Sequence, residues 1–191
     1  MDLILASSSP YRRELLARLG LSFRCIEPGV DEETMKRSLL DPTVLAETLA
    51  RAKAESVAAY LPEAVVIGSD QLVAFDGRIM GKPITAEHAV EQLLCLAGHE
   101  HQLITSAAVA DVAGTETVTD VTTLLMRALS RSEAERYVEA DRPLDCAGSY
   151  KIEARGIALF DRIDSRDHSA IIGLPLLAVC RMLRSRGFAL P

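Results

Sequence analysis

The sequence predicts a mixed α/β or α+β fold in which helices flank a sheet of long strands. Aliphatic runs typical of buried strands alternate with segments whose apolar residues recur at helical spacing. Two long β-rich runs, 101–112 and 116–129, are joined by "VAGT" and predict a hairpin. No linker, repeat or low-complexity tract interrupts the 191 residues. We therefore expect a single domain over residues 1–191.

The first half of the chain begins with a strand and a capped helix. Ser9 is a helix N-cap, Pro10 suits the first helical position, and Gly20 ends the helix. Residues 29–41 form a polar, acidic connection. The predicted strands are 2–6, 21–28 and 64–75, and the predicted helices are 10–20 and 42–60, the second opened by Asp41-Pro42.

The second half carries its own turn and cap signals. Asp76-Gly77 predicts a tight turn, and Gly98 ends a helix. Ser130 or Ser132, each followed three residues later by glutamate, caps another helix. The predicted helices are 85–96, 130–140 and one that starts at Pro175, and the predicted strand is 156–163.

Composition excludes several classes of protein. The net charge of −6 argues against a partner that is a nucleic-acid polymer. No uncharged apolar run reaches the length of about 18 residues that a spanning helix needs, and a signal peptide is not recognisable. The four cysteines are far apart, so we expect reduced thiols in a cytoplasmic protein, without zinc or disulfides.

A cluster of serines and arginines marks the first strand-to-helix corner. Ser7, Ser8 and Ser9 precede a helix start, where unpaired N–H groups and the helix dipole favour anions. Arg12 and Arg13 add forked donors suited to phosphate oxygens. The corner is therefore a candidate phosphate site. The alternative is that Ser9 only caps the helix and that the arginines are solvated.

Further charged residues stand at places that suit the same chemistry. Asp70 ends an otherwise buried run, and buried carboxylates need partners. Lys82 lies between Gly81 and Pro83, Glu32 lies in an acidic loop, and Lys53 lies mid-helix. Each alone has a structural explanation, as a turn former or a solvated charge. Together they indicate metal-assisted phosphoryl chemistry.

Six segments carry a resemblance to a known family: "LILASSSPYRRELL", "PGVDEE", "LARAKAESVA", "VVIGSDQLVAFDGRIMGKP", "DCAGSYKIEARGIALF" and "IIGLPL". The chain resembles the Maf/YceF family of nucleotide pyrophosphatases from residue 3 to about residue 183. The resemblance implies an α/β fold related to the inosine triphosphate pyrophosphatases, with a cleft between two lobes. It also implies metal-dependent cleavage of nucleoside triphosphates to monophosphate and pyrophosphate, in the cytoplasm and often by a homodimer.

Three positions sort the subgroups of this family. Tyr11, Gln71 and Glu153 resemble the YceF subgroup, whose implied substrate is 7-methyl-GTP, although that subgroup usually has Trp at the first position. Tyr11 keeps an aromatic face on which a cationic base gains about 0.5–2 kcal/mol. Glu153 can accept hydrogen bonds from the guanine edge, and Gln71 can donate and accept. The implied role is the house-cleaning of modified nucleotides.

The resemblance and the chemistry together assign a role to each candidate. We expect Asp70 to act as general base or as a metal ligand, with Glu32 and Asp70 holding Mg²⁺ or Mn²⁺. The triphosphate would be bound by Ser8, Arg12, Arg13, Lys53 and Lys82. His88, His99, His101 and His168 match no motif, and we expect surface or structural roles for them.

Two other functions stay open. The chain could prefer a canonical nucleotide such as UTP or dTTP. It could instead be a non-catalytic nucleotide-binding regulator of septum formation. The combination of Asp70 with the cations favours catalysis, because binding alone would not need the strand-end carboxylate.

Overall fold

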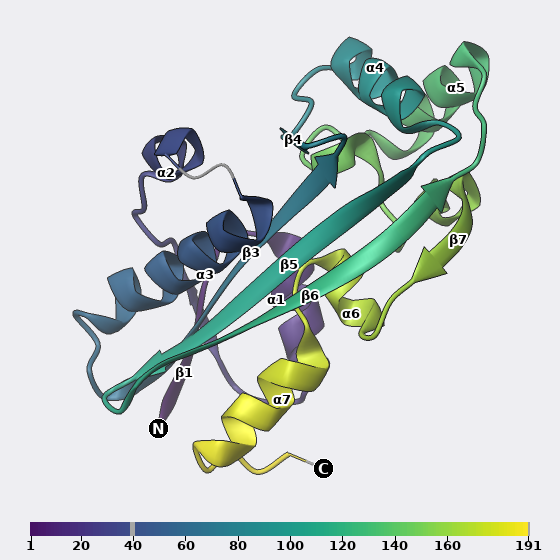
Figure 1. Ribbon diagram of the computed structural model, residues 1–191. Helices are drawn as coiled ribbons and strands as arrows, with labels where there is room; N and C mark the ends of the chain where they lie inside the picture. The colour runs from purple at the N-terminus through teal and green to yellow at the C-terminus, as the bar shows by residue number, and fades with distance from the viewer. Residues whose placement is uncertain (39–40, 191) are drawn as a thin grey trace. The chain divides into compact units, whose positions relative to one another are not determined.

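A computed structural model describes residues 1–38 and 41–190, and its strands form a seven-stranded mixed sheet (Figure 1). The strand order is β2-β1-β3-β5-β6-β7, and β4 pairs with β3. β1 is parallel to β2 and β3, whereas β4 is antiparallel to β3 and β7 to β6. The α/β class with a long-stranded sheet is confirmed. The strands are β1 Asp2–Ala6, β2 Arg24–Ile26, β3 Ala64–Phe75, β4 Arg78–Met80, β5 Glu100–Asp111, β6 Gly114–Met126 and β7 Phe160–Asp164.

Most helices begin where the sequence signals place them. Ser9, Asp41 and Thr85 each accept a hydrogen bond from a backbone N–H in the first helical turn. Ser130 forms a full capping box with Glu133, which decides between the two serines considered for that helix. The helices are α1 Pro10–Ala17, α2 Glu32–Ser38, α3 Pro42–Ala58, α4 Ala86–Leu96, α5 Arg131–Asp141, α6 His168–Ile172 and α7 Leu176–Ser185, with 3₁₀ turns η1 Ala147–Ser149 and η2 Arg155–Leu159.

Two local predictions were wrong, and one short helix was missed. The acidic connection contains α2, because Asp31 accepts bonds from Thr34 and the following acidic residues suit a helix N-terminus. The strand expected over 156–163 begins as η2, because the chain folds back on itself at Gly156, whose N–H donates to the Lys151 carbonyl. The short helix α6 was not predicted, and Asp167 caps it.

The chain divides into two compact units, and the division falls within the three longest strands. The first unit contains residues 1–71, 105–120 and 167–191, and the second contains 72–104 and 121–166. The arginine and serine corner, the acidic residues and Lys53 belong to the first unit. Lys82 and Glu153 belong to the second.

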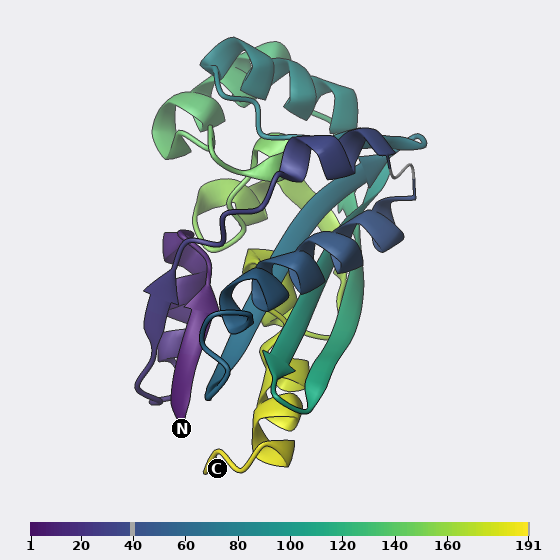
Figure 2. The same ribbon diagram turned by 90° about the vertical axis from the view of Figure 1, so that its left-hand side faces the viewer.

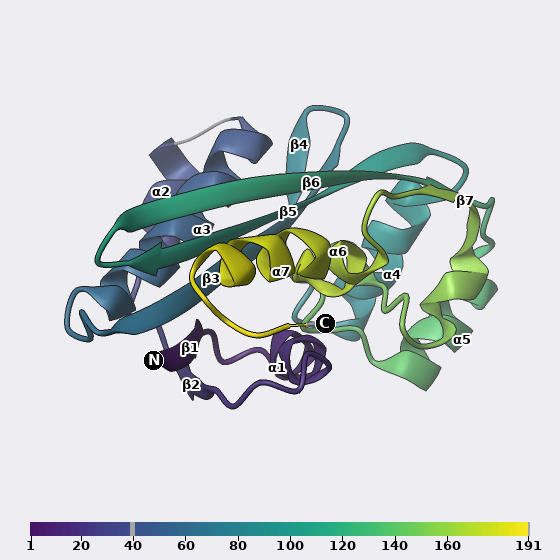
Figure 3. The same ribbon diagram turned by 90° about the horizontal axis from the view of Figure 1, so that it is seen from below.

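In the first unit, helices cover both faces of the sheet (Figures 2 and 3). Alternate residues of each strand face opposite sides. Leu3, Leu5 and Ile67 pack with apolar residues of α1 and α7, whereas Ile4 and Val66 pack with small residues of α3. A layer of helix therefore lies on each side of the strands that carry the candidate site.

The backbones of α3 and β3 touch at Gly68. A Cβ atom at that position would lie 2.3 Å from the Ala50 carbonyl oxygen and 2.6 Å from the Ala54 nitrogen. Only glycine permits this approach. Ala50 lies three residues before Lys53 on α3 and Ala54 directly follows it, while Gly68 lies two residues before Asp70 on β3.

The C-terminal end of α7 is tied to the β5–β6 hairpin through Arg186. Its guanidinium forms ion pairs with Asp111 at 2.6 Å and Glu116 at 3.1 Å, and it also donates to the Val109 carbonyl oxygen. This arginine is mostly buried, so the network closes one end of the first unit.

In the second unit, α4 packs against α5 and against η1. Asp76 and Gly77 both have positive φ, as the predicted tight turn between β3 and β4 requires. The rings of His101, Tyr150 and Phe160 form an aromatic cluster. None of the helices in the described ranges has the length and apolar character needed to cross a bilayer.

Candidate functional site

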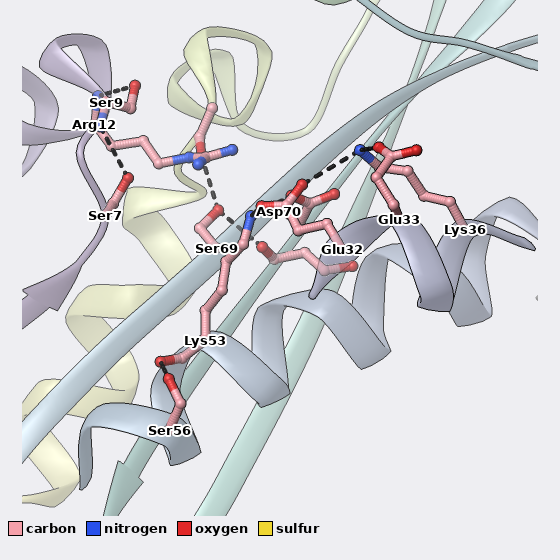
Figure 4. Close-up of polar contacts among 12 residues, drawn as sticks. Ser7, Ser9, Arg12, Glu32, Glu33, Lys36, Lys53, Ser56, Ser69 and Asp70 are labelled. Atoms are coloured by element: carbon pink, nitrogen blue, oxygen red, sulfur yellow. Dashed lines mark hydrogen bonds and ion pairs between the residues drawn. The ribbon is translucent and has the colours of Figure 1, made fainter. Parts of the chain in front are cut away.

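A buried ion cluster is the centre of the candidate site (Figure 4). The Lys53 Nζ atom lies 2.6 Å from Asp70 Oδ1 and 2.8 Å from Glu32 Oε1. The exposed fraction of the side chain is 7% for Lys53 and 9% for Asp70, against 37% for Glu32. The structure thus brings together three residues that are singled out separately in the sequence and come from α3, β3 and α2.

The cluster exists because a buried charge requires compensation. Lys53 projects from a face of α3 otherwise made of small and apolar residues, so its ammonium cannot reach bulk water readily. Asp70, which was expected at the end of a strand, lies instead within β3, so its carboxylate has the same difficulty. A direct ion pair and the nearby Glu32 carboxylate satisfy both groups. The main role of Lys53 that the structure shows is therefore structural, as the ion-pair partner of Asp70 and Glu32.

Electrostatics keep Glu32 ionised. Burial alone would raise the pKa of Glu32, but the hydrogen bond from Lys53 and the positive charges of Lys53 and Lys36 outweigh it and lower that pKa. Lys36 reaches Glu32 at 3.3 Å. Glu32 therefore carries its negative charge at neutral pH, where it can attract a cation.

Arg12 is held next to this cluster by the main chain of a distant segment. Its Nε atom donates to the Gly173 carbonyl oxygen at 2.9 Å. Burial lowers the pKa of Arg12, and the charges of Asp70 and Glu32 oppose that shift. Because Nε is engaged and the described residues accept no bond from the two Nη atoms, these remain the donors suited to an anion.

Ser69 also bonds to the Gly173 carbonyl oxygen, and it was not among the site residues predicted from the sequence. Its fully buried hydroxyl lies 2.8 Å from the carbonyl oxygens of both Ser106 and Gly173. One hydroxyl has one proton, so it donates to one of these acceptors at a time. Its position in "GSD" gave no separate signal, because a serine before an aspartate is also typical of a turn.

The serine corner divides into structural and accessible parts. Ser7 Oγ accepts from the Ser9 N–H at 3.1 Å, and Ser9 Oγ accepts from the Arg12 N–H at 3.4 Å. Ser8 is exposed. Together with Arg13 it lines a hollow of about 390 Å³ beside α1. The structure thus gives Arg12 and Arg13 different surroundings, with only Arg12 beside the buried cluster.

Gln71 does not have the free donor that the sequence analysis gave it. Its Nε2 atom lies within 3.0 Å of Thr105 Oγ1 and of the Ala170 and Ile171 carbonyl oxygens. The amide group therefore fastens α6 to β3, and its Oε1 atom is the part left for a ligand. Tyr11 is half-buried in the first turn of α1.

The two remaining candidates, Lys82 and Glu153, belong to the second unit. Lys82 is exposed in the loop after β4, and Glu153 is exposed between η1 and η2. Among the histidines, His88, His99 and His168 are exposed, and His101 is buried with its Nε2 atom 3.1 Å from the Tyr150 hydroxyl. Surface and structural roles fit these positions.

The residues present suit a hard divalent cation only in part. Glu32 and Asp70 offer carboxylate oxygens that already converge on one positive charge, which is the donor type that Mg²⁺ and Mn²⁺ prefer. Within the described ranges no group of three or more His, Cys, Asp or Glu side chains could hold a metal by itself. An ion here would need further oxygens from substrate or water. No disulfide links the four cysteines, all of which are described.

Comparisons with known proteins identify the family and the fold. The Maf-like protein family matches residues 2–186. A Bdellovibrio bacteriovorus protein named 7-methyl-GTP pyrophosphatase is 51% identical over 184 residues, which are 96% of each chain. A Pseudomonas putida protein of the same name is 42% identical over the full length of both chains. A solved HAM1 protein from Coxiella burnetii shares the fold, with a TM-score of 0.50 at 12% identity over 97% of this chain and 99% of that one.

Proposed function

Because this chain belongs to the Maf family, we propose that it is a nucleoside triphosphate pyrophosphatase that cleaves 7-methyl-GTP to 7-methyl-GMP and pyrophosphate. The names of its relatives support the activity and the substrate. The observation that carries the proposal is the buried cluster of Lys53, Asp70 and Glu32 beside the Arg12 guanidinium. Acids and cations combined at this depth suit phosphoryl chemistry better than binding alone.

Asp70 is the proposed general base. Its Oδ1 atom accepts the Lys53 bond, which leaves Oδ2 as the oxygen that can take a proton from the attacking water. The Lys53 ammonium, 2.6 Å from Oδ1, fixes the orientation of the carboxylate. Attack at the α-phosphorus would then expel pyrophosphate.

The cations have two proposed tasks. Arg12, through its Nη atoms, and Lys82 neutralise the triphosphate and the charge that develops on the leaving group. Ser8 and Arg13 add donors at the corner of α1. Lys53 binds the phosphates only in addition to its acid partners, which revises the role expected from the sequence.

A divalent cation is part of the proposal. Glu32 and Asp70 would hold Mg²⁺ or Mn²⁺, which when bound supplies charge neutralisation for the phosphate oxygens. The chain itself supplies the two carboxylates and keeps them close together through Lys53.

Base selection is assigned to Tyr11, Glu153 and the Oε1 atom of Gln71. An aromatic face and a carboxylate both favour the positive charge of 7-methylguanine. The proposal further covers residues 1–191 as one Maf-like domain that acts as a homodimer in the cytoplasm. The family resemblance supports the dimer, and the dispersed cysteines support the reducing compartment.

The test is release of pyrophosphate from a panel of 7-methyl-GTP, GTP, UTP and dTTP with added Mg²⁺ or Mn²⁺. We expect 7-methyl-GTP to give the highest kcat/KM. Asp70→Asn should lower kcat by about 10²–10⁴-fold. Asp161→Asn is a matched control, because Asp161 is exposed on β7.

The outcomes separate the alternatives. If activity were highest on UTP or dTTP, the proposed substrate would be wrong but the proposed reaction would stand. Nucleotide binding without pyrophosphate release would refute the enzyme and favour a binding regulator. Unchanged turnover in Asp70→Asn would remove Asp70 from the reaction.

A further inference from the structure

A single glutamine joins the two loops of the second unit that carry Lys82 and Glu153. Gln92 lies on α4 and is half-buried. Its Nε2 atom donates to the Gly81 carbonyl oxygen at 3.0 Å, and its Oε1 atom accepts from the Ser149 hydroxyl at 2.6 Å. A carbonyl oxygen can only accept, so the contact with Gly81 fixes which way the amide faces.

Each loop is bonded close to its proposed ligand residue. Gly81 directly precedes Lys82, and the Ile84 N–H donates to the Leu144 carbonyl oxygen at 3.2 Å. On the other side, the Lys151 N–H donates to the Tyr137 hydroxyl at 2.8 Å. The Lys151 carbonyl oxygen accepts from the N–H groups of Ala154 and Gly156, which closes the turn around Glu153.

Both loops contain backbone that needs external support. Ile84 has φ of 67° and Ser149 has φ of 63°, conformations that L-residues with a side chain seldom adopt. Such residues persist where the surrounding contacts over-determine them. Ser149 is fully buried, and its hydroxyl is bonded to Gln92. Gln92 therefore fixes the strained Ser149 directly. It supports the strained Ile84 indirectly, through its bond to Gly81 three residues earlier.

We infer that Gln92 is a positioning residue that holds the Lys82 loop and the Glu153 turn in one fixed geometry. The inference rests on the proposed function, in which Lys82 binds phosphate and Glu153 reads the base. Gln92 touches neither ligand group itself. Its effect is to make phosphate binding and base selection depend on the same amide.

The first test is amide hydrogen exchange in three variants of the full chain. Gln92→Leu should raise the exchange rate of the Ile84 and Lys151 amides by about three- to tenfold, since both loops lose a bond. Gln92→Glu keeps the acceptor for Ser149 but loses the donor to Gly81, so it should raise exchange at Ile84 alone. Gln102→Leu, at an exposed position of β5, should change neither.

The second test is kinetic. Gln92→Leu should raise KM for 7-methyl-GTP and lower kcat/KM by about five- to fiftyfold, as for two lost hydrogen bonds. It should also reduce the preference for 7-methyl-GTP over GTP. That loss of preference should vanish in a Glu153→Gln background, because the residue being positioned is then absent.

Each result decides a separate question. Exchange that rises in one loop only in Gln92→Leu, or equally across the whole chain, would overturn the bridge. Normal kinetics despite faster exchange would overturn the positioning role. If the wild type released no pyrophosphate from any triphosphate, the proposed function and the positioning of its ligands would fail, while the exchange result would still decide the bridge itself.

Discussion

Removal of Lys53 is the sharpest test of the buried cluster. Lys53→Met removes the ammonium that lies 2.6 Å from the Asp70 carboxylate, a side chain that is only 9% exposed in the wild type. Breaking a buried pair from one side costs about 3–5 kcal/mol in the free energy of unfolding. In Asp70→Asn the cost should be smaller, about 1–3 kcal/mol, because Lys53 keeps Glu32 at 2.8 Å. The double variant should lose clearly less than the sum of the two.

Urea unfolding followed by circular dichroism measures these values, since the chain has no tryptophan. The matched control is Arg51→Met on the same helix, where an exposed arginine pairs with Glu55 at 3.3 Å. We expect a change within about 0.5 kcal/mol there. Equal losses for Lys53→Met and Arg51→Met, or strict additivity of Lys53→Met and Asp70→Asn, would refute a buried, coupled pair.

Four further results are expected. Gly68→Ala should destabilise the protein by about 3 kcal/mol or more, because the new methyl group meets the α3 backbone, and urea unfolding would measure it. Burial lowers the pKa of His101 from 6.5 to about 4, so as pH falls the unfolded chain takes up this proton before the folded chain does. The free energy of unfolding should therefore fall by roughly 3 kcal/mol between pH 6.5 and pH 4. Urea unfolding should show that His101→Leu lacks this loss. Arg12→Ala should weaken triphosphate binding by about 1.5–3 kcal/mol, and monophosphate binding less, in calorimetric titrations. Glu153→Gln should shift the ranking of kcat/KM from 7-methyl-GTP toward UTP or dTTP by about 1–3 kcal/mol.

Local chemistry explains which elements could be predicted from the sequence. Ser9, Asp41 and Thr85 act within their own helical turn, so their capping roles are visible in a short window. The Asp76-Gly77 turn is local for the same reason. The acidic segment around Glu32 was misjudged because solvated loops and helix N-termini favour the same residues.

The site was predictable as a set of residues but not as a geometry. Lys53 and Asp70 each stand out in the sequence as a charge among apolar neighbours, yet their pairing depends on how α3 lies on β3. Gln71 has the same amide whether it binds a base or fastens α6. Gln92 and Ser69 carry no sequence signal, because their partners are main-chain atoms and a hydroxyl far away in the chain.

The discontinuous first unit has a consequence for the order of folding. Its last segment, residues 167–191, follows the whole of the second unit in the chain. The Arg12 guanidinium donates to the carbonyl oxygen of Gly173, 161 residues later in the chain. Arg186 bonds to partners that precede it by 70 to 77 residues. During synthesis, therefore, the second unit emerges complete before the first can close. Contacts of such long sequence separation form slowly. We expect the nascent chain to acquire a structured second unit first and to assemble the ion cluster's surroundings only after α7 has left the ribosome.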